Sequence, residues 1–215
     1  MKRSIFIKRI IAIAIGIQAM TNVAWAQSAR EVLDATAACM TKMGDVRAQF
    51  KATQFSGMTP QSEASGTMCI SGRKFQMQTD ELTTWYDGTT QWSMMSGSNE
   101  VNMATPDEEE QAALNPATLV GIYKKGYRYS LTRSTLRGRS TFVVHLSAKN
   151  RKAAFSDIFI DVDQTTYHPL CIRAKKDGDW ARLSILSFQN SLTLPASTFT
   201  FPASDYPNVE VIDLR

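Results

Sequence analysis

Few side chains in this 215-residue sequence have the chemistry that catalysis needs. It contains two histidines, His145 and His168. His145 falls on the opposite face of an expected strand from Val144 and Leu146 and should point to solvent, while His168 precedes a proline in an expected turn. The sequence lacks the Gly-x-Ser-x-Gly, His-Glu-x-x-His and Cys-x-x-Cys patterns and a glycine-rich phosphate loop. We therefore expect neither catalysis nor a cofactor.

Two groups of acidic residues could in principle bind a hard cation. The first, Asp107 to Glu110, is consecutive in sequence, so its carboxylates would spread around a helix instead of meeting at one point. Acids in this position suit the start of a helix. The second group, Asp157, Asp161 and Asp163, follows the alternation of one solvated strand face. Neither group predicts a metal site.

The apolar residues are more informative than the polar ones. Eight of the ten methionines follow residue 26, and methionine fills irregular space and adapts to varied partners. A strongly curved sheet has a concave face that its own side chains need not fill, and an apolar cavity is the usual ligand site. Strand alternation alone gives these candidate lining residues: Phe50, Met68, Met77, Trp85, Trp92, Met94 and Met103.

A strand-rich fold must position these residues. The stretch from Trp85 to Met103 reads as an antiparallel meander around the turn Asp87-Gly88. Alternation and turn residues predict about ten short strands, hence a mainly β fold with an antiparallel sheet curled into a sandwich or barrel. The strands are expected at 46–55, 64–70, 74–79, 82–86, 91–95, 100–103, 127–133, 141–147, 158–163, 170–175, 180–188 and 199–201, with a loop at 56–62.

Two short amphipathic helices interrupt the strands. Ser28 and Glu31 form a capping-box pattern that predicts a helix over Ser28–Met43. Asn115-Pro116 predicts the start of a second helix, and the residues Leu119, Val120 and Tyr123 give it one apolar side. We expect these helices to form a lid over the concave face.

Residues 1–26 have the pattern of a cleaved signal peptide. A basic start precedes the apolar run Ile10–Ile17, and Ala24-Trp25-Ala26 is a small-residue cleavage site. Residues 27–215 are then expected to form one exported domain. Four of the 24 basic residues precede position 27, which leaves 20 bases against 20 acids, so we do not expect nucleic-acid binding.

Three cysteines remain in the expected domain: Cys39, Cys69 and Cys171. Each has apolar neighbours in sequence, which favours buried free thiols that pack as small hydrophobic groups. The alternative is a Cys69–Cys171 disulfide, and the sequence does not decide between them.

Taken in order, these features resemble the LolA family of periplasmic outer-membrane lipoprotein carriers. The resemblance comes from the leader, the first helix, the hairpin at 87–92, the Asn115-Pro116 helix and Phe199-Thr200-Phe201-Pro202. The ending, Val211 to Arg215, resembles LolA-like proteins of the Bacteroides group. The resemblance implies an incomplete antiparallel β-barrel, closed by a lid of short helices around a hydrophobic cavity that binds lipoprotein acyl chains.

The resemblance also implies partners. The carrier would take lipoproteins from an inner-membrane ABC-type releasing complex and pass them to an outer-membrane acceptor, and we expect it to act as a monomer. An arginine near the third strand ties the lid closed in this family, and Arg73 is the candidate here. The alternative reading of Arg73 is an ordinary turn residue.

Three other functions stay open at this stage. The first is an acyl-binding sensor, although such sensors usually carry a further C-terminal domain for which we expect this chain to be too short. The second is a secreted lipid-modifying hydrolase, which would need His145 or His168 beside a nucleophile. The third is a structural surface protein.

Overall fold

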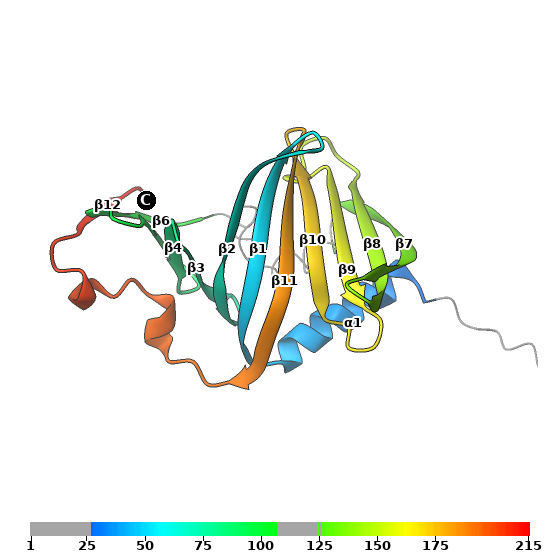
Figure 1. Cartoon of the computed structure of the whole chain (residues 1–215), viewed down its shortest axis with the longest axis horizontal. Coiled ribbons are helices and arrows are strands. Elements are labelled where there is room, and N and C mark those ends of the chain that lie inside the picture. The colour runs from blue at the N-terminus through cyan, green and yellow to red at the C-terminus, as the bar shows by residue number, and fades with distance from the viewer. Residues whose placement is uncertain (1–26, 107–123, 125) are drawn as a thin grey trace, which may run out of the picture.

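The computed structural model describes residues 27–106, 124 and 126–215, and within them the chain forms one strongly curved sheet (Figure 1). The only α-helix of these residues is α1 (Ala29–Lys42). The strands are β1 (Asp45–Ser56), β2 (Thr59–Ser71), β3 (Lys74–Thr79), β4 (Leu82–Tyr86), β5 (Gln91–Met95), β6 (Glu100–Ala104), β7 (Tyr127–Leu136), β8 (Arg139–Ala148), β9 (Asp157–Asp163), β10 (Pro169–Lys176), β11 (Asp179–Leu192) and β12 (Glu210–Asp213). Two 3₁₀ helices, η2 (Ala196–Phe199) and η3 (Ala203–Asp205), lie between β11 and β12.

The strand order is β12-β6-β5-β4-β3-β2-β1-β11-β10-β9-β8-β7. Strands β1 to β6 and β7 to β11 follow one another along the chain, mostly through short turns, and pair in antiparallel fashion. Strands β1 and β11 are far apart in sequence and also pair in antiparallel fashion. Among the described strands, only β12 runs parallel to its partner, β6. Asp87 stabilises one such turn, because its carboxylate accepts the backbone N–H groups of Thr89 and Thr90 at 2.8 Å each. The expectation of a mainly β, incomplete antiparallel barrel is confirmed.

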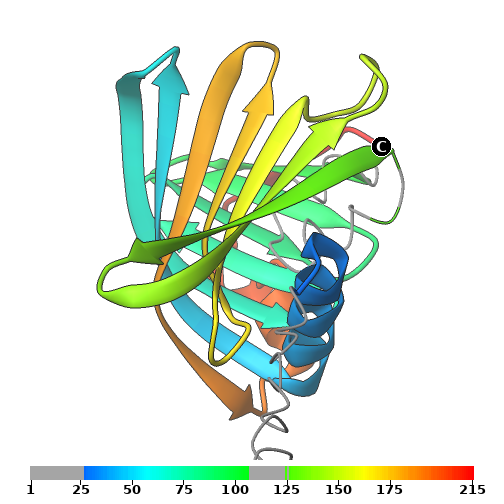
Figure 2. The same cartoon turned by 90° about the vertical axis from the view of Figure 1, so that its right-hand side faces the viewer.

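Helix α1 lies inside the curve of the sheet (Figure 2). The expected capping box is present: Ser28 Oγ accepts the Glu31 N–H at 3.2 Å, and the Glu31 carboxylate accepts the Ser28 N–H at 2.7 Å. The first half of the helix buries Val32 and Leu33 completely against β8 and β9. This packing is the largest core of the described chain, and it fixes α1 against one half of the sheet.

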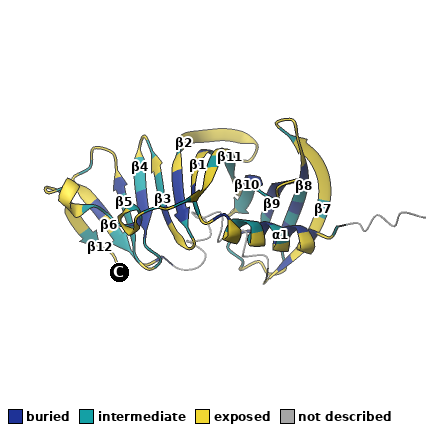
Figure 3. Ribbon diagram, turned by 90° about the horizontal axis from the view of Figure 1, so that it is seen from below, coloured by how far each residue is buried: buried dark blue, intermediate teal, exposed yellow. Residues whose placement is uncertain are grey.

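Residues that pair across strands lie on the same face of the sheet. The strand registers therefore assign the remaining buried residues to two clusters, one on each face. On the concave face, Phe50, Met68, Ile70, Phe75 and Tyr86 form one cluster. On the opposite face, Trp85, Met94 and Val101 form another cluster under the C-terminal segment. Figure 3 shows buried residues along the middle strands, whereas the edge strand β7 is mostly exposed.

Three details of the sequence prediction were wrong. The stretch 56–62 was expected to be a loop, but β2 starts at Thr59 and only Gly57-Met58 turns, because β1 and β2 keep pairing up to Ser56↔Thr59. The segment 199–201 was expected to be a strand, but η2 ends at Phe199. Pro195 and Pro202 flank this segment in sequence, and Phe199 and Phe201 pack against the sheet. Strand β12 was not expected at all.

Among the described residues, no helix combines the length and the apolar character that crossing a bilayer requires.

Candidate functional site

The main site is a hollow between α1 and the middle of the sheet, with a volume of about 360 Å³. The second half of α1 contributes Ala37 and Met40 to its wall, and the C-cap residue Met43 also lines it. The opposite wall comes from three adjacent strands, and its side chains are almost all apolar: Val46, Ala48, Phe50, Met68, Ile70, Leu183, Ile185 and Phe188. A few polar residues, among them Asp45, Lys124 and His168, also line it. This is the composition of an apolar ligand site with few polar groups.

A second hollow of about 450 Å³ continues from the first. The two share Phe50, Met68 and Leu183, so these side chains line both spaces. The second hollow is lined further by Ala52, Ala64, Met77, Phe155, Ile172 and Trp180. Together the two hollows form an apolar trough along the concave face, which we call the trough.

Small residues and one β-bulge create this space. Ala48, Ala52 and Ala64 occupy wall positions where larger side chains would fill the trough. The pairing of β1 with β11 shifts between Gln49 and Phe50, so that Ile185 pairs with Phe50 while Phe188 pairs with Ala48. Because of the extra residue, Ile185 and Phe188 both face the trough although they are three positions apart.

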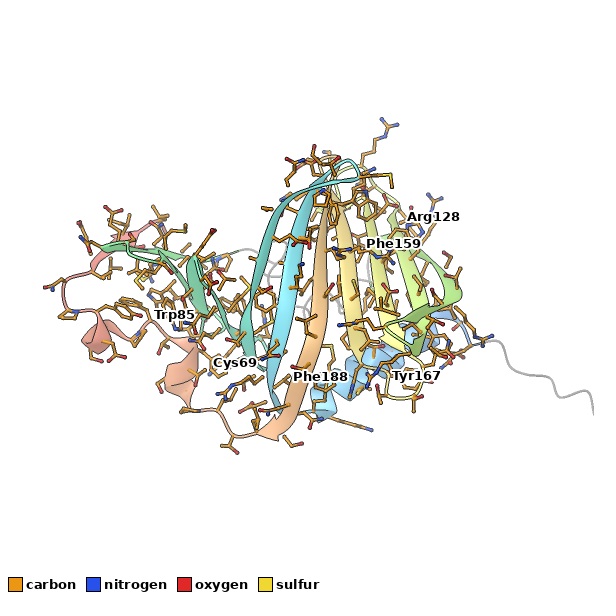
Figure 4. The ribbon with its side chains drawn as sticks, in the orientation of Figure 1. Cys69, Trp85, Arg128, Phe159, Tyr167 and Phe188 are labelled. Atoms are coloured by element: carbon orange, nitrogen blue, oxygen red, sulfur yellow. The ribbon has the colours of Figure 1, made fainter. Side chains whose placement is uncertain are left out.

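The structure divides the predicted lining residues between the two faces. Phe50, Met68 and Met77 line the trough. Trp85, Trp92 and Met94 lie in the cluster on the opposite face, where Trp85 meets Phe201 edge-on at 5.5 Å between ring centroids. Met103 pairs with Trp92 and therefore shares that face. Figure 4 shows Trp85 on the side of the sheet that faces the C-terminal segment.

The predicted lid is only partly described. Helix α1 covers the first hollow of the trough with its second half. Leu119, Val120 and Tyr123 lie outside the residues that the structure describes. Arg73 lies in the turn between β2 and β3, beside the Tyr86 phenol. Burial raises the pKa of Tyr86, and the Arg73 guanidinium acts in the opposite direction.

Side chains that sequence reasoning missed contribute much of the trough. Helical spacing gave the position of α1 and its apolar side, but not which of these apolar residues would border open space. Ile185 and Phe188 could not be assigned to one face without knowledge of the bulge. The alanines carry no signal in the sequence, because their effect is to leave space empty.

Among the described residues, His145 does not form a nucleophile–base pair with the nearby serine. His145 Nε2 lies 2.9 Å from Asp157 Oδ1, and the other oxygen of Asp157 accepts the Ser156 hydroxyl at 3.0 Å. The carboxylate therefore stands between the serine and the histidine, whereas activation of a serine needs the histidine in the middle. His145 stacks on Phe159, with ring centroids 4.1 Å apart. No group of three metal-binding side chains occurs among the described residues.

The cysteines are free thiols in the structure. Cys69 and Cys171 are buried, as expected, while Cys39 is only partly buried and lies 3.4 Å from the Thr166 carbonyl oxygen. Burial raises the pKa of both Cys39 and Cys171, which keeps these thiols protonated near neutral pH. None of the three cysteines lines either hollow of the trough.

Sequence comparison assigns this architecture to a family. Residues 20–178, more than half of the chain, match the family described as outer membrane lipoprotein carrier protein LolA. The chain belongs to the LolA family. No curated protein matches its sequence. The apolar trough is thus found in a LolA-family sheet.

Solved structures resemble this chain at low sequence identity, and one of them supports the fold. A conserved protein from Thermus thermophilus superposes with a TM-score of 0.58 at 12% identity, covering 87% of this chain and 99% of that one. Lipoprotein LppX of Mycobacterium tuberculosis gives a TM-score of 0.47 at 9% identity, covering 78% and 98%. A LolA superfamily protein of Nitrosomonas europaea gives 0.44 at 10% identity, covering 82% and 99%.

Proposed function

We propose that this protein is a periplasmic carrier that holds the acyl chains of lipoproteins in the trough and ferries them from the inner to the outer membrane. The observation that carries the proposal is the trough itself, an apolar space on the concave face of a LolA-family sheet. The protein acts by binding and release, without catalysis or a cofactor.

Burial of hydrocarbon supplies the affinity. An acyl chain of roughly a dozen methylenes gains about 10 kcal/mol on transfer out of water, at about 0.8 kcal/mol per methylene. A lipoprotein cannot cross an aqueous compartment without such a shield. Release then requires that the closed state be only slightly favoured, and polar contacts between lid and rim can set that balance. We propose Arg73 for this role, with Leu119, Val120 and Tyr123 as the apolar side of the lid.

The remaining parts of the proposal concern the route. Residues 1–26 act as the signal peptide, and residues 27–215 form one carrier domain of the Bacteroides-group type. Its partners are an inner-membrane ABC-type releasing complex and an outer-membrane acceptor, and the carrier is a monomer. An acyl-binding sensor would use the same trough, so the two functions differ in what happens to the cargo.

Native mass spectrometry of the protein purified from its own periplasm tests the binding. We expect lipid or lipopeptide adducts. Ala52→Trp should remove them, since Ala52 lines the trough and pairs with Ala64 and Leu183 on the same face. Thr67→Trp is the matched control, because Thr67 is exposed on the opposite face of β2. Adducts that survive Ala52→Trp would contradict the proposed site.

Depletion of the protein separates a carrier from a sensor. Loss of a carrier should leave lipoproteins in the inner membrane, which fractionation of the two membranes would reveal. Normal sorting in depleted cells would contradict transport while leaving binding intact.

A further inference from the structure

Strands β10 and β11 part before β11 ends. Their last paired residues at this end are Cys171 and Ser184, yet β11 continues on β1 as far as Leu192. Pro169, at the start of β10, has no N–H with which to extend the pairing. We call the gap that begins between Leu170 and Ile185 the seam.

One side chain bridges the seam. Arg137 Nη2 donates to the Leu170 carbonyl oxygen at 3.1 Å and to the Ile185 carbonyl oxygen at 2.7 Å. Arg137 lies at the tip of the β7–β8 hairpin, where it and Gly138 both have positive φ, 51° and 77°. These two hydrogen bonds place the guanidinium against both β10 and β11.

Two hollows meet at the seam. The outer one, of about 540 Å³, is lined by Arg137, Arg139 and Leu186 among others. It shares Ile185, His168 and Phe188 with the inner trough. The rings of His168 and Phe188 lie edge to face, 4.4 Å apart between centroids. Figure 4 shows Phe188 near the end of β11. A partition of three side chains therefore separates the outer hollow from the trough.

We propose that the seam is a second passage into the trough, used by an acyl chain whose polar head carries negative charge. The inference rests on the proposed function, because it requires that the trough hold an acyl chain. The chain would enter between β10 and β11 past Phe188, while the head stays outside against Arg137 and Arg139.

The positive charge of Arg137 accounts both for the closed seam and for the preference for an anionic head group. Arg137 is exposed and bonds to neutral carbonyl oxygens, whereas hydrogen bonds from a guanidinium to an anion are stronger. An anionic head therefore competes for Arg137 and loosens the bridge that holds the seam. Arg139 is also exposed and lies 3.4 Å from Asp163, which does not line the outer hollow. Among the described residues, the outer hollow is therefore lined by two guanidinium groups and by no carboxylate.

The test compares two fluorescent probes of the same chain length, cis-parinaric acid and its methyl ester, by stopped-flow mixing with the protein purified from cells that export it. The wild-type protein should take up the acid faster than the ester. Arg137→Ala should raise the uptake rate of the ester by about tenfold, since hydrogen bonds to a charged group are lost, and should bring the two rates together.

Three further variants complete the test. Arg128→Ala removes an exposed arginine from the far end of the same hairpin and should leave both rates unchanged. Phe188→Ala should raise the uptake rates of both probes and keep their ratio. If Arg137→Ala does not fold, Phe188→Ala replaces it as the variant that tests the passage. Arg137→Lys should keep part of the preference for the acid.

The outcomes are distinct. If the wild-type protein binds neither probe at equilibrium, the proposed function fails, and this inference fails with it. If the probes bind but Arg137→Ala and Phe188→Ala leave both rates unchanged, the seam is not a passage and the proposed function stands.

Discussion

The two faces of the β1–β6 half of the sheet carry similar apolar residues, but only one face is closely covered by the rest of the described chain. On the back face, Trp85, Met94 and Val101 are covered by Phe201, Tyr206 and Val209 from the end of the chain. On the concave face, Phe50, Met68 and Met77 border open space. The difference lies in the cover, because the chain supplies aromatic side chains to one face and small residues to the other. Apolar strands alone therefore do not identify a ligand site.

The largest expected effect separates stability from binding. Trp85→Ala should lower the free energy of unfolding by about 3–5 kcal/mol, because it leaves a cavity under the C-terminal segment. Urea titration measures this loss, and the affinity for cis-parinaric acid should not change.

Phe50→Ala is the matched variant on the other face. Phe50 is only 2% exposed, so its loss should also destabilise the fold, but it lines both parts of the trough and should weaken probe binding as well. Equal losses of probe affinity in folded Trp85→Ala and Phe50→Ala would contradict the claim that only the concave face binds the ligand.

A smaller effect is expected at Gly66, which pairs with Phe50 across β1 and β2. A Cβ at this position would collide with the Gln78 carbonyl oxygen and crowd the Phe50 ring. Gly66→Ala should therefore cost about 1–3 kcal/mol of stability and reduce probe affinity. Thermal unfolding and a probe titration measure the two effects. Ser65→Ala, at the exposed neighbouring position, should change neither.

The smallest expected effect depends on pH. Burial lowers the pKa of His168, Arg139 lowers it further, and Asp163 opposes the shift. The unfolded chain, with a pKa of about 6.5, then binds the proton more readily than the folded chain. The stability contributed by neutral His168 is complete above about pH 6.5 and is lost as the pH falls through the folded pKa. Between about pH 7 and pH 5, the melting temperature of His168→Gln should fall less steeply than that of the wild-type protein. Identical slopes would show that His168 does not contribute to the pH dependence of stability.

Local signals in the sequence predicted the elements well. The capping box at Ser28 and Glu31 gave the start of α1, and alternation gave the strands from β3 to β5 with their observed bounds. These features depend on residues close together in the chain, where propensity and hydrogen bonding act directly.

The site was harder to predict because it depends on distant residues. Alternation put Phe50 and Trp85 in one set, since it separates two faces of each strand but does not relate the faces of different strands. The bulge opposite Phe50 and the parallel strand β12 arise from pairing over long separations. The seam follows from the point at which β10 stops pairing, which no short pattern encodes.

The pairing of β1 with β11 has a consequence for the order of folding. It joins Asp45 to Leu192 and Phe50 to Ile185, so the two strands that wall the trough are separated by most of the polypeptide. Contacts over such separations form slowly, because a long loop must close before they can contribute. A growing chain cannot complete the trough before β11 has been synthesised, so the proposed capture of cargo must follow that step.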